Sequence, residues 1–178
     1  MKDETLIKPD RETADETKAG NYFVSNYPPF SFWNDDDIPC VESMLNSPSP
    51  GTAPMGLYYH VPFCRKRCHF CYFKVYTDKN SAAVRRYLSA TMKELEAYAQ
   101  SPYIQGRKPK FVYFGGGTPS YLSAQQLTEL TDEMKAILPW DEAEEVTFEC
   151  EPGTLSEPKI DALKRLGVTR LSLGVENF

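Results

Sequence analysis

The 178-residue chain lacks several features that define whole classes of protein. It contains no apolar run of about 18 residues, so we expect no membrane-spanning helix. The first twenty residues are charged and polar and lack the apolar stretch of a secretory signal, so we expect a cytoplasmic protein. The net charge is −5 and there is no basic stripe, which argues against nucleic acid as a partner.

Cysteine is scarce and unevenly placed. Three of the five cysteines, Cys64, Cys68 and Cys71, lie in the stretch HVPFCRKRCHFCYF at residues 60–73. Thiols in the cytosol stay reduced, and an odd count with tight clustering favours metal binding over disulfides. Because thiolates prefer soft or borderline metals, the motif predicts either an iron–sulfur cluster or a zinc ion.

The C-x3-C-x2-C spacing supplies three ligands where a closed site needs four. A [4Fe–4S] cluster held by three cysteines would keep one iron open for a small molecule. A zinc ion could instead complete its four ligands with His60 or His69, which are close in the sequence. The spacing alone leaves both alternatives open.

The chain falls into three predicted parts. Residues 1–20 are rich in charged and polar residues and predict a disordered tail. Residues 21–55 contain six prolines and predict an irregular N-terminal arm that lies on the domain surface. Residues 56–178 alternate between strand and helix patterns, with strands predicted at 56–61, 110–114, 145–150 and 169–175 and helices at 80–100 and about 124–138, and a short helix after Ser156.

This alternation predicts an α/β domain with a parallel sheet and right-handed crossovers. Asn80 or Ser81 can cap the first helix, Ser123 and Gln126 form a capping-box pattern, and Gly167 can end the last helix. Four strands cannot close a barrel, and nothing downstream covers the last strand. We therefore expect the chain to be the N-terminal part of a longer protein.

Several signals follow the strands at one edge of the predicted sheet. The glycine run FGGGTPS at residues 114–120 permits close approach of a ligand to the backbone, but it is neither a P-loop nor a dinucleotide fingerprint. Glu149 ends the third strand, where a carboxylate suits a ribose or an amine. Tyr58 and His60 share one face of the first strand. Since ligands bind at the carboxyl ends of parallel strands, these signals predict one site.

The segments YYHVPFCRKRCHFCYF, FGGGTPSYLS, TFECEPGTLS and RLGVTRLSLGVENF carry a family resemblance. Over about residues 56–178 the chain resembles the oxygen-independent coproporphyrinogen III oxidase-like branch of the radical SAM superfamily. The resemblance implies a partial (β/α)6 barrel of the radical SAM type, truncated here after the fourth strand.

The resemblance also implies cofactors and their contacts. Cys64, Cys68 and Cys71 would hold a [4Fe–4S] cluster, and S-adenosylmethionine would bind its open iron and yield a 5′-deoxyadenosyl radical. Glu176 replaces a glutamine that serves a second cofactor molecule in coproporphyrinogen oxidase, which puts that second site in doubt. The remaining implied cofactor contacts are Tyr58, Phe70, Gly116, Gly117, Thr118 and Glu149.

The family's substrates suggest a tetrapyrrole, acted on by decarboxylation, methyl transfer, ring opening or haem chaperoning. The basic run Arg65, Lys66 and Arg67 would offset cluster charge or dock an acidic electron donor such as a flavodoxin or ferredoxin. No side chain is assigned a catalytic role. A zinc-stabilised, non-catalytic binding module and an inert fragment of a larger enzyme remain the alternatives.

Residues around the motif have simpler expected roles. Phe63, Phe70 and Phe73 would shield the cluster from water. Cys40 and Cys150 have no partner motif, so we expect both to be buried as small apolar residues.

Overall fold

The computed structural model describes residues 32, 34–49, 51, 53–69, 71 and 73–175. Phe70, Glu176 and the predicted tail over residues 1–20 lie outside these residues. The chain divides into two units, Met1–Val41 and Glu42–Phe178. All strands that the structure describes belong to the second unit. The predicted boundaries at residues 20 and 55 stay a prediction.

A short helical segment lies within the part predicted to be irregular. A 3₁₀ turn, η3, spans Asp35–Asp37, and helix α1 spans Ile38–Leu45. Asn34 caps the turn, because its side chain accepts a 2.9 Å hydrogen bond from the Asp36 amide. The prolines led us to expect no helix, but Pro39 lies in the first turn of α1, where a helix tolerates a missing amide hydrogen.

Four parallel strands form one sheet in the order β1-β2-β3-β4. The strands are β1 (Met55–Val61), β2 (Pro109–Gly116), β3 (Glu145–Cys150) and β4 (Arg170–Leu173). The parallel sheet and the strand sequence agree with the predicted α/β fold. Because every strand runs the same way, the carboxyl ends of all four meet at one edge.

Three helices connect the strands: α2 (Ser81–Gln100), α3 (Ala124–Ile137) and α4 (Glu157–Leu166). Asn80 caps α2, and Ser123 with Gln126 forms the predicted capping box at the start of α3. Gly167 ends α4 with φ of 87°, a left-handed conformation that glycine adopts at little cost. The predicted start and stop signals are therefore confirmed.

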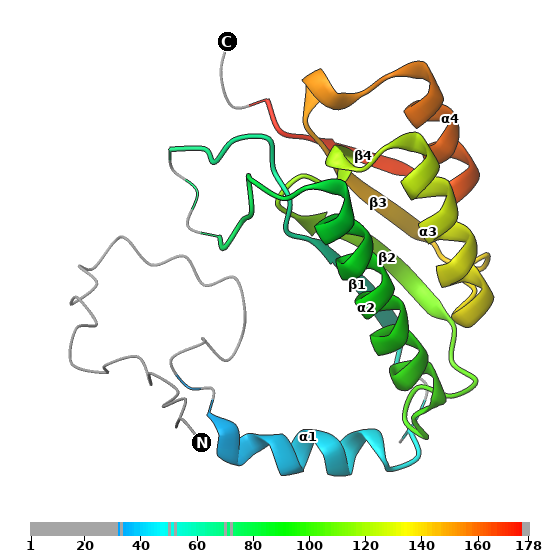
Figure 1. The fold of residues 1–178 in the computed structure, drawn as a ribbon. Helices are drawn as coiled ribbons and strands as arrows, with labels where there is room; N and C mark the ends of the chain where they lie inside the picture. Colours follow the sequence, from blue (N-terminus) through cyan, green and yellow to red (C-terminus); the bar gives the residue numbers. More distant parts are fainter. Residues whose placement is uncertain are drawn as a thin grey trace, which may run out of the picture. The chain divides into compact units, whose positions relative to one another are not determined.

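Helices α2, α3 and α4 all lie on one face of the sheet (Figure 1). Trp140, in the α3–β3 connection, packs in this layer, since its ring meets Phe114 and its Nε1 donates to the Leu166 carbonyl at 3.2 Å. Alternate residues of three strands point into the same layer and are buried, namely Tyr59, Val61, Val112, Phe114, Val146 and Phe148.

The opposite face of the sheet is more open. Tyr58 and Phe111 lie there with 57% and 40% of their surfaces exposed. Register places Glu149 on β3 beside Ser172 on β4, on the same face as Tyr58. Within the described ranges, none of the helices combines the length and apolar character needed to cross a bilayer.

Two short 3₁₀ turns continue the strands at the carboxyl edge. Turn η4 (Pro119–Tyr121) follows β2 and turn η5 (Pro152–Thr154) follows β3. Each begins with a proline, whose fixed φ suits the first position of a helical turn. These turns direct the chain back toward the helix layer and leave the preceding backbone at the edge of the sheet.

Candidate functional site

The carboxyl edge of the sheet is hollowed. A cavity of about 780 Å³ lies there, within the size range of small-molecule sites. Its wall is built by the segments that follow β1, β2 and β3 and by the end of β4. The cavity brings together the predicted site residues that the structure describes: Tyr58, Cys64, Cys68, Cys71, Gly116, Gly117, Thr118 and Glu149.

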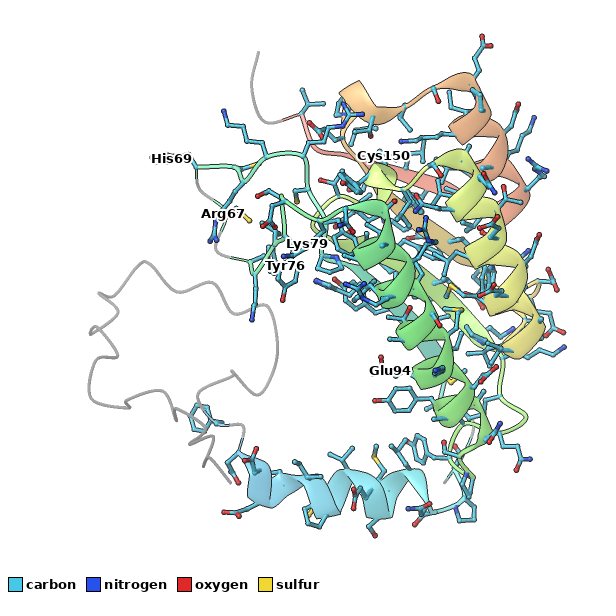
Figure 2. All side chains as sticks on the ribbon, in the orientation of Figure 1. Arg67, His69, Tyr76, Lys79, Glu94 and Cys150 are labelled. Carbon is cyan, nitrogen blue, oxygen red and sulfur yellow. The ribbon has the colours of Figure 1, made fainter. Side chains whose placement is uncertain are left out.

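The loop that carries Cys64, Cys68 and Cys71, here called the cysteine loop, is held at its base by backbone hydrogen bonds. The Tyr76 amide donates to the Pro62 carbonyl at 2.8 Å, and the Cys64 amide donates to the Tyr76 carbonyl at 3.1 Å. The Arg67 guanidinium donates to the Cys71 carbonyl at 2.8 Å. Figure 2 shows Arg67 and His69 on the outer part of this loop, with Tyr76 and Lys79 on its return to α2. The three cysteines are therefore carried by a loop with a defined base.

The three thiols differ in exposure but influence one another. Cys64 is buried, Cys71 is half-buried and Cys68 is exposed. Burial raises the pKa of the Cys64 thiol, a hydrogen bond from Thr118 lowers it, and the neighbouring Cys71 and Cys68 raise it further. Each additional negative charge makes the next thiol harder to ionise, so the charges of the three thiols are coupled.

The three thiols are the donor type of both predicted metal groups, an iron–sulfur cluster and a zinc ion. Within the described part of the chain, no group of three or more His, Cys, Asp or Glu side chains is gathered tightly enough to hold a metal ion. Three thiolates that line one cavity are the donor set of a [4Fe–4S] cluster with one open iron, and thiolates also bind zinc. His69 is exposed, and His60 Nδ1 lies 2.9 Å from the Tyr58 hydroxyl.

Two glycines at the carboxyl end of β2, its last residue Gly116 and the following Gly117, make room for neighbouring side chains. Gly116 has φ of 115°, and a Cβ there would lie 2.7 Å from the His60 ring. A Cβ on Gly117 would lie 2.9 Å from the Cys64 sulfur. The segment Gly116–Thr118, here called the glycine turn, therefore packs directly against β1 and the cysteine loop. A larger residue at Gly116 or Gly117 would push the turn away from them.

Thr118 joins this turn to the first cysteine. Its amide donates to the Phe63 carbonyl at 2.8 Å, and its hydroxyl donates to the Cys64 sulfur at 3.5 Å. The Gly117 amide adds a bond to the Val61 carbonyl at 2.8 Å. A hydroxyl that donates to a sulfur stabilises the thiolate form, so the Thr118 hydrogen bond lowers the pKa of Cys64.

Tyr58 and His60 meet on the open face of β1. The Tyr58 hydroxyl and His60 Nδ1 are 2.9 Å apart. Burial is the main cause that lowers the pKa of His60, with Glu149 opposing it. Burial also raises the pKa of the Tyr58 phenol, and Glu149 raises it further. The hydrogen bond and the lowered pKa both favour the neutral form of His60.

Glu149 is held by two neutral donors. The Tyr113 hydroxyl donates to Oε1 at 2.6 Å, and the Gly116 amide donates to Oε2 at 3.2 Å. Of the ion pairs formed by the described residues, none includes Glu149. The carboxylate is thus fixed at the cavity wall with its negative charge unneutralised by a side chain.

A buried hydroxyl pair ties the turn after β2 to the turn after β3. Ser120 and Thr154 are only 1% and 4% exposed, and their hydroxyls bond to each other. The Ser120 Oγ accepts from the Glu151 amide at 3.0 Å, and the Thr154 hydroxyl donates to the Glu151 carbonyl at 2.7 Å. Lys159 of α4 donates to the Ser120 carbonyl at 2.5 Å. Two walls of the cavity are therefore fastened to each other.

The two remaining cysteines behave differently. Cys150, at the end of β3 (Figure 2), is 4% exposed, and burial is the main cause that raises its pKa to about 11, which confirms the expected buried thiol. Cys40 is exposed, so the expectation that it is buried was wrong. The reason is local, because α1 buries none of its residues, and Ile38 and Val41 are about half exposed as well.

Two of the three phenylalanines expected to shield a cluster, Phe63 and Phe73, are among the described residues, and the shielding role stays a prediction. Phe63 is buried at 3% exposure and packs edge-to-face on Tyr87. Phe73 lines the cavity but is 41% exposed.

Tyr113, Ser120 and Thr154 were not predicted from the sequence. Alternation along β2 places Tyr113 on the same face as Tyr58, which is the signal that could have found it.

Known proteins resemble the chain in sequence. It is 35% identical over 125 residues to the heme chaperone HemW of Escherichia coli, covering 70% of this chain and 32% of that protein. It is 36% identical over 125 residues to an anaerobic coproporphyrinogen III oxidase of Cereibacter sphaeroides, covering 70% of this chain and 27% of that protein. The chain thus spans about a third of the length of the curated relatives it matches.

The fold gives a matching result. A solved structure described as coproporphyrinogen III oxidase (HemN) from Escherichia coli, a radical SAM enzyme, superposes with a TM-score of 0.74 at 29% identity. The superposition covers 88% of this chain and 35% of that one. The family model of the radical SAM superfamily matches residues 58–178, which include the cysteine loop, the glycine turn and Glu149. The chain belongs to the radical SAM superfamily, with homology to its coproporphyrinogen III oxidase and heme chaperone members.

Proposed function

We propose that the chain binds a [4Fe–4S] cluster through Cys64, Cys68 and Cys71 and binds S-adenosylmethionine at the open iron. The observation that carries this proposal is that the three thiols line one cavity with Glu149 and the glycine turn. Bound there and reduced by an external electron donor, the cluster would supply the electron for cleavage of a sulfur–carbon bond of S-adenosylmethionine, which would give methionine and a 5′-deoxyadenosyl radical able to take a hydrogen atom from the substrate.

The chain's own residues would bind and orient the cofactor. Glu149 offers a fixed carboxylate for the ammonium group, and a charge-assisted hydrogen bond of this kind is strong. Gly116 and Gly117 bring the backbone to the cavity wall, and Thr118 supports Cys64. Tyr58 lies at the same wall with an exposed ring that can cover the cofactor. Phe70 and Glu176 are kept as further proposed contacts.

The proposed substrate class is a tetrapyrrole. Support comes from the names of the relatives, a heme chaperone and coproporphyrinogen III oxidases. A reaction of the oxidase kind would make the protein an oxidoreductase of porphyrin biosynthesis, acting in the cytoplasm. Because the chain spans about a third of those relatives, the rest of such a protein would supply the substrate contacts.

The proposed electron donor is an acidic redox protein such as a flavodoxin or ferredoxin. Residues 65–86 contain seven basic residues and one acidic residue, a net charge of +6, whereas the whole chain carries −5, so the remaining residues sum to −11. Arg65, Lys66 and Arg67 are all exposed, beside the exposed Cys68. An acidic donor would be attracted to this segment and repelled elsewhere.

Anaerobic reconstitution of the full chain with iron and sulfide tests the proposal. We expect a brown protein with about four irons per chain, and after reduction with dithionite its electron paramagnetic resonance spectrum should change when S-adenosylmethionine is added. Cys68→Ala should lose the iron, because two thiolates hold a cubane poorly. Cys40→Ala is the matched control, since this exposed thiol lies outside the cavity and its loss should leave the iron content unchanged.

Two other outcomes would overturn the proposal. A colourless chain that retains one tightly bound zinc ion would indicate a zinc-stabilised binding module. A loaded cluster whose spectrum does not respond to S-adenosylmethionine would remove the cofactor from the proposal and leave only an iron–sulfur protein.

A further inference from the structure

Tyr113 makes the shortest described contact to Glu149. Its hydroxyl donates to Oε1 at 2.6 Å, while the Gly116 amide donates to Oε2 at the longer distance of 3.2 Å. Two donors on the two oxygens fix both the position and the plane of the carboxylate. Hydrogen bonds to a charged group contribute more than those between neutral groups, so the tyrosine is the stronger restraint.

The ring of Tyr113 is itself held in place. It packs between two neighbours on the open face, with ring centroids 6.0 Å from Tyr58 and 6.1 Å from Phe111. A Cβ on Gly115 would lie 2.7 Å from the Tyr113 ring and 3.1 Å from the Tyr58 ring. The first glycine of the run therefore lets both rings lie close to the backbone, which directs the phenol toward Glu149.

The charge of Glu149 is oriented without being neutralised. Tyr113 and the Gly116 amide are neutral donors, and none of the described ion pairs includes this carboxylate. A half-buried carboxylate is stable with hydrogen bonds alone but keeps its attraction for a cation. A lysine or arginine in the place of Tyr113 would form an ion pair with Glu149 and neutralise its charge.

Tyr113 remains a hydrogen donor over the whole physiological range. Burial is the largest cause that raises its pKa, to about 12, and the bond to Glu149 raises it next. The phenol therefore keeps its proton well above neutral pH and can donate to Glu149 there.

We propose that Tyr113 is a positioning residue that holds the Glu149 carboxylate in the orientation needed to accept the ammonium group of S-adenosylmethionine. The inference rests on the proposed cofactor site and adds a residue to it. Tyr113 acts through Glu149 and need not touch the cofactor.

A double-mutant cycle on the reconstituted full chain tests this coupling. Tyr113→Phe removes one hydroxyl and should weaken S-adenosylmethionine binding about tenfold, as expected for a lost hydrogen bond to a charged group. Glu149→Gln should weaken binding more. If the tyrosine acts through the carboxylate, adding Tyr113→Phe to Glu149→Gln should cause little further loss. Additive losses would overturn the proposal.

Tyr59→Phe is the matched control, because its hydroxyl bonds to Thr91 on the helix side of the same sheet. It should leave the cofactor dissociation constant unchanged even where it lowers thermal stability. If the iron content is unchanged in all variants, a weaker binding of S-adenosylmethionine is not caused by a loss of cluster assembly. Equal weakening by Tyr59→Phe and Tyr113→Phe would indicate a general loss of stability and would contradict the positioning role.

A second measurement needs no cofactor. In the iron-free chain, Tyr113→Phe should release the carboxylate and speed hydrogen exchange of the Gly116 amide, which donates to the other oxygen. Exchange is measured by nuclear magnetic resonance, with Tyr59→Phe compared in parallel. An unchanged Gly116 exchange rate would overturn the proposal even if the chain failed to bind S-adenosylmethionine, whereas that failure alone would count against the proposed function.

Discussion

The two faces of the sheet differ in character, since one is apolar and buried and the other is open and carries polar side chains. The helix-facing side carries apolar residues that are fully buried, such as Phe114 and Phe148 at 0% exposure. The open side carries Tyr58, which bonds to His60, and Tyr113, which bonds to Glu149. Because side chains alternate along a strand, β1, β2 and β3 each contribute to both faces.

This division allows the site to be polar without weakening the core. Burial of apolar side chains on one face supplies most of the favourable free energy of folding. The other face can then keep a charged carboxylate and a neutral histidine in fixed positions. The comparison predicts that substitutions on the helix side change stability, whereas substitutions on the open side change binding.

The largest expected effect comes from the helix side. Phe114→Ala removes a fully buried ring that packs on Phe148 at 5.3 Å, and it should lower the free energy of unfolding by about 3–5 kcal/mol. Tyr58→Ala, on the adjacent strand but 57% exposed, should cost less than about 1 kcal/mol. Urea denaturation followed by circular dichroism measures both. Equal losses would break the comparison between the two faces.

A substitution in the glycine turn is expected to affect both the stability of the chain and the candidate site. Gly117→Ala puts a Cβ within 2.9 Å of the Cys64 sulfur and the Phe63 carbonyl, so it should cost about 1–3 kcal/mol and reduce iron loading as well. Gly153→Ala is the control, since no atom lies within 4 Å of a Cβ there although Gly153 also lines the cavity. Unfolding and iron content are measured on both variants, and a similar loss from Gly153→Ala would contradict the steric explanation.

The order of elements could be predicted because each one carries its own local signal. Period-3.6 and period-2 patterns mark the helices and strands, and Asn80, Ser123 and Gly167 mark helix ends by short-range hydrogen bonds and backbone conformation. The meeting of the cysteine loop, the glycine turn and Glu149 follows from parallel strands alone. Signals of this kind depend only on neighbours in sequence and on chain direction.

Contacts between distant segments could not be predicted in the same way. Nothing within β2 indicates that Tyr113 reaches a carboxylate 36 residues away, or that Gly116 makes room for His60. The exposure of Cys40 was missed because the burial of a residue depends on what packs against its helix, and α1 buries nothing. Such features require the three-dimensional arrangement.

A smaller effect is expected from the bond between the two turns. Thr154→Val keeps the side-chain shape but removes the hydroxyl that donates to Glu151 and bonds to Ser120. It should lower the free energy of unfolding by about 1–2 kcal/mol, since it leaves a buried hydroxyl short of a partner. Thr154→Ser retains the hydroxyl and should recover most of the loss in the same denaturation experiment. No difference between Val and Ser would show that packing alone matters here.

The smallest expected effect is a change in pH dependence on the open face. Burial lowers the pKa of His60 in the folded chain below its ordinary value of 6.5, although Glu149 opposes the shift and Tyr58 bonds to the ring. His60 in the unfolded chain therefore binds a proton more readily than His60 in the folded chain. The stability associated with neutral His60 is present above about pH 6.5 and is lost as the pH falls through 6.5 toward the lower pKa of the folded chain. His60→Gln should make the urea midpoint of the iron-free chain less dependent on pH between about 7.5 and 5.5. Carboxylates titrate mostly at lower pH and are common to both chains, so an identical pH dependence would mean that His60 is not held in its neutral form.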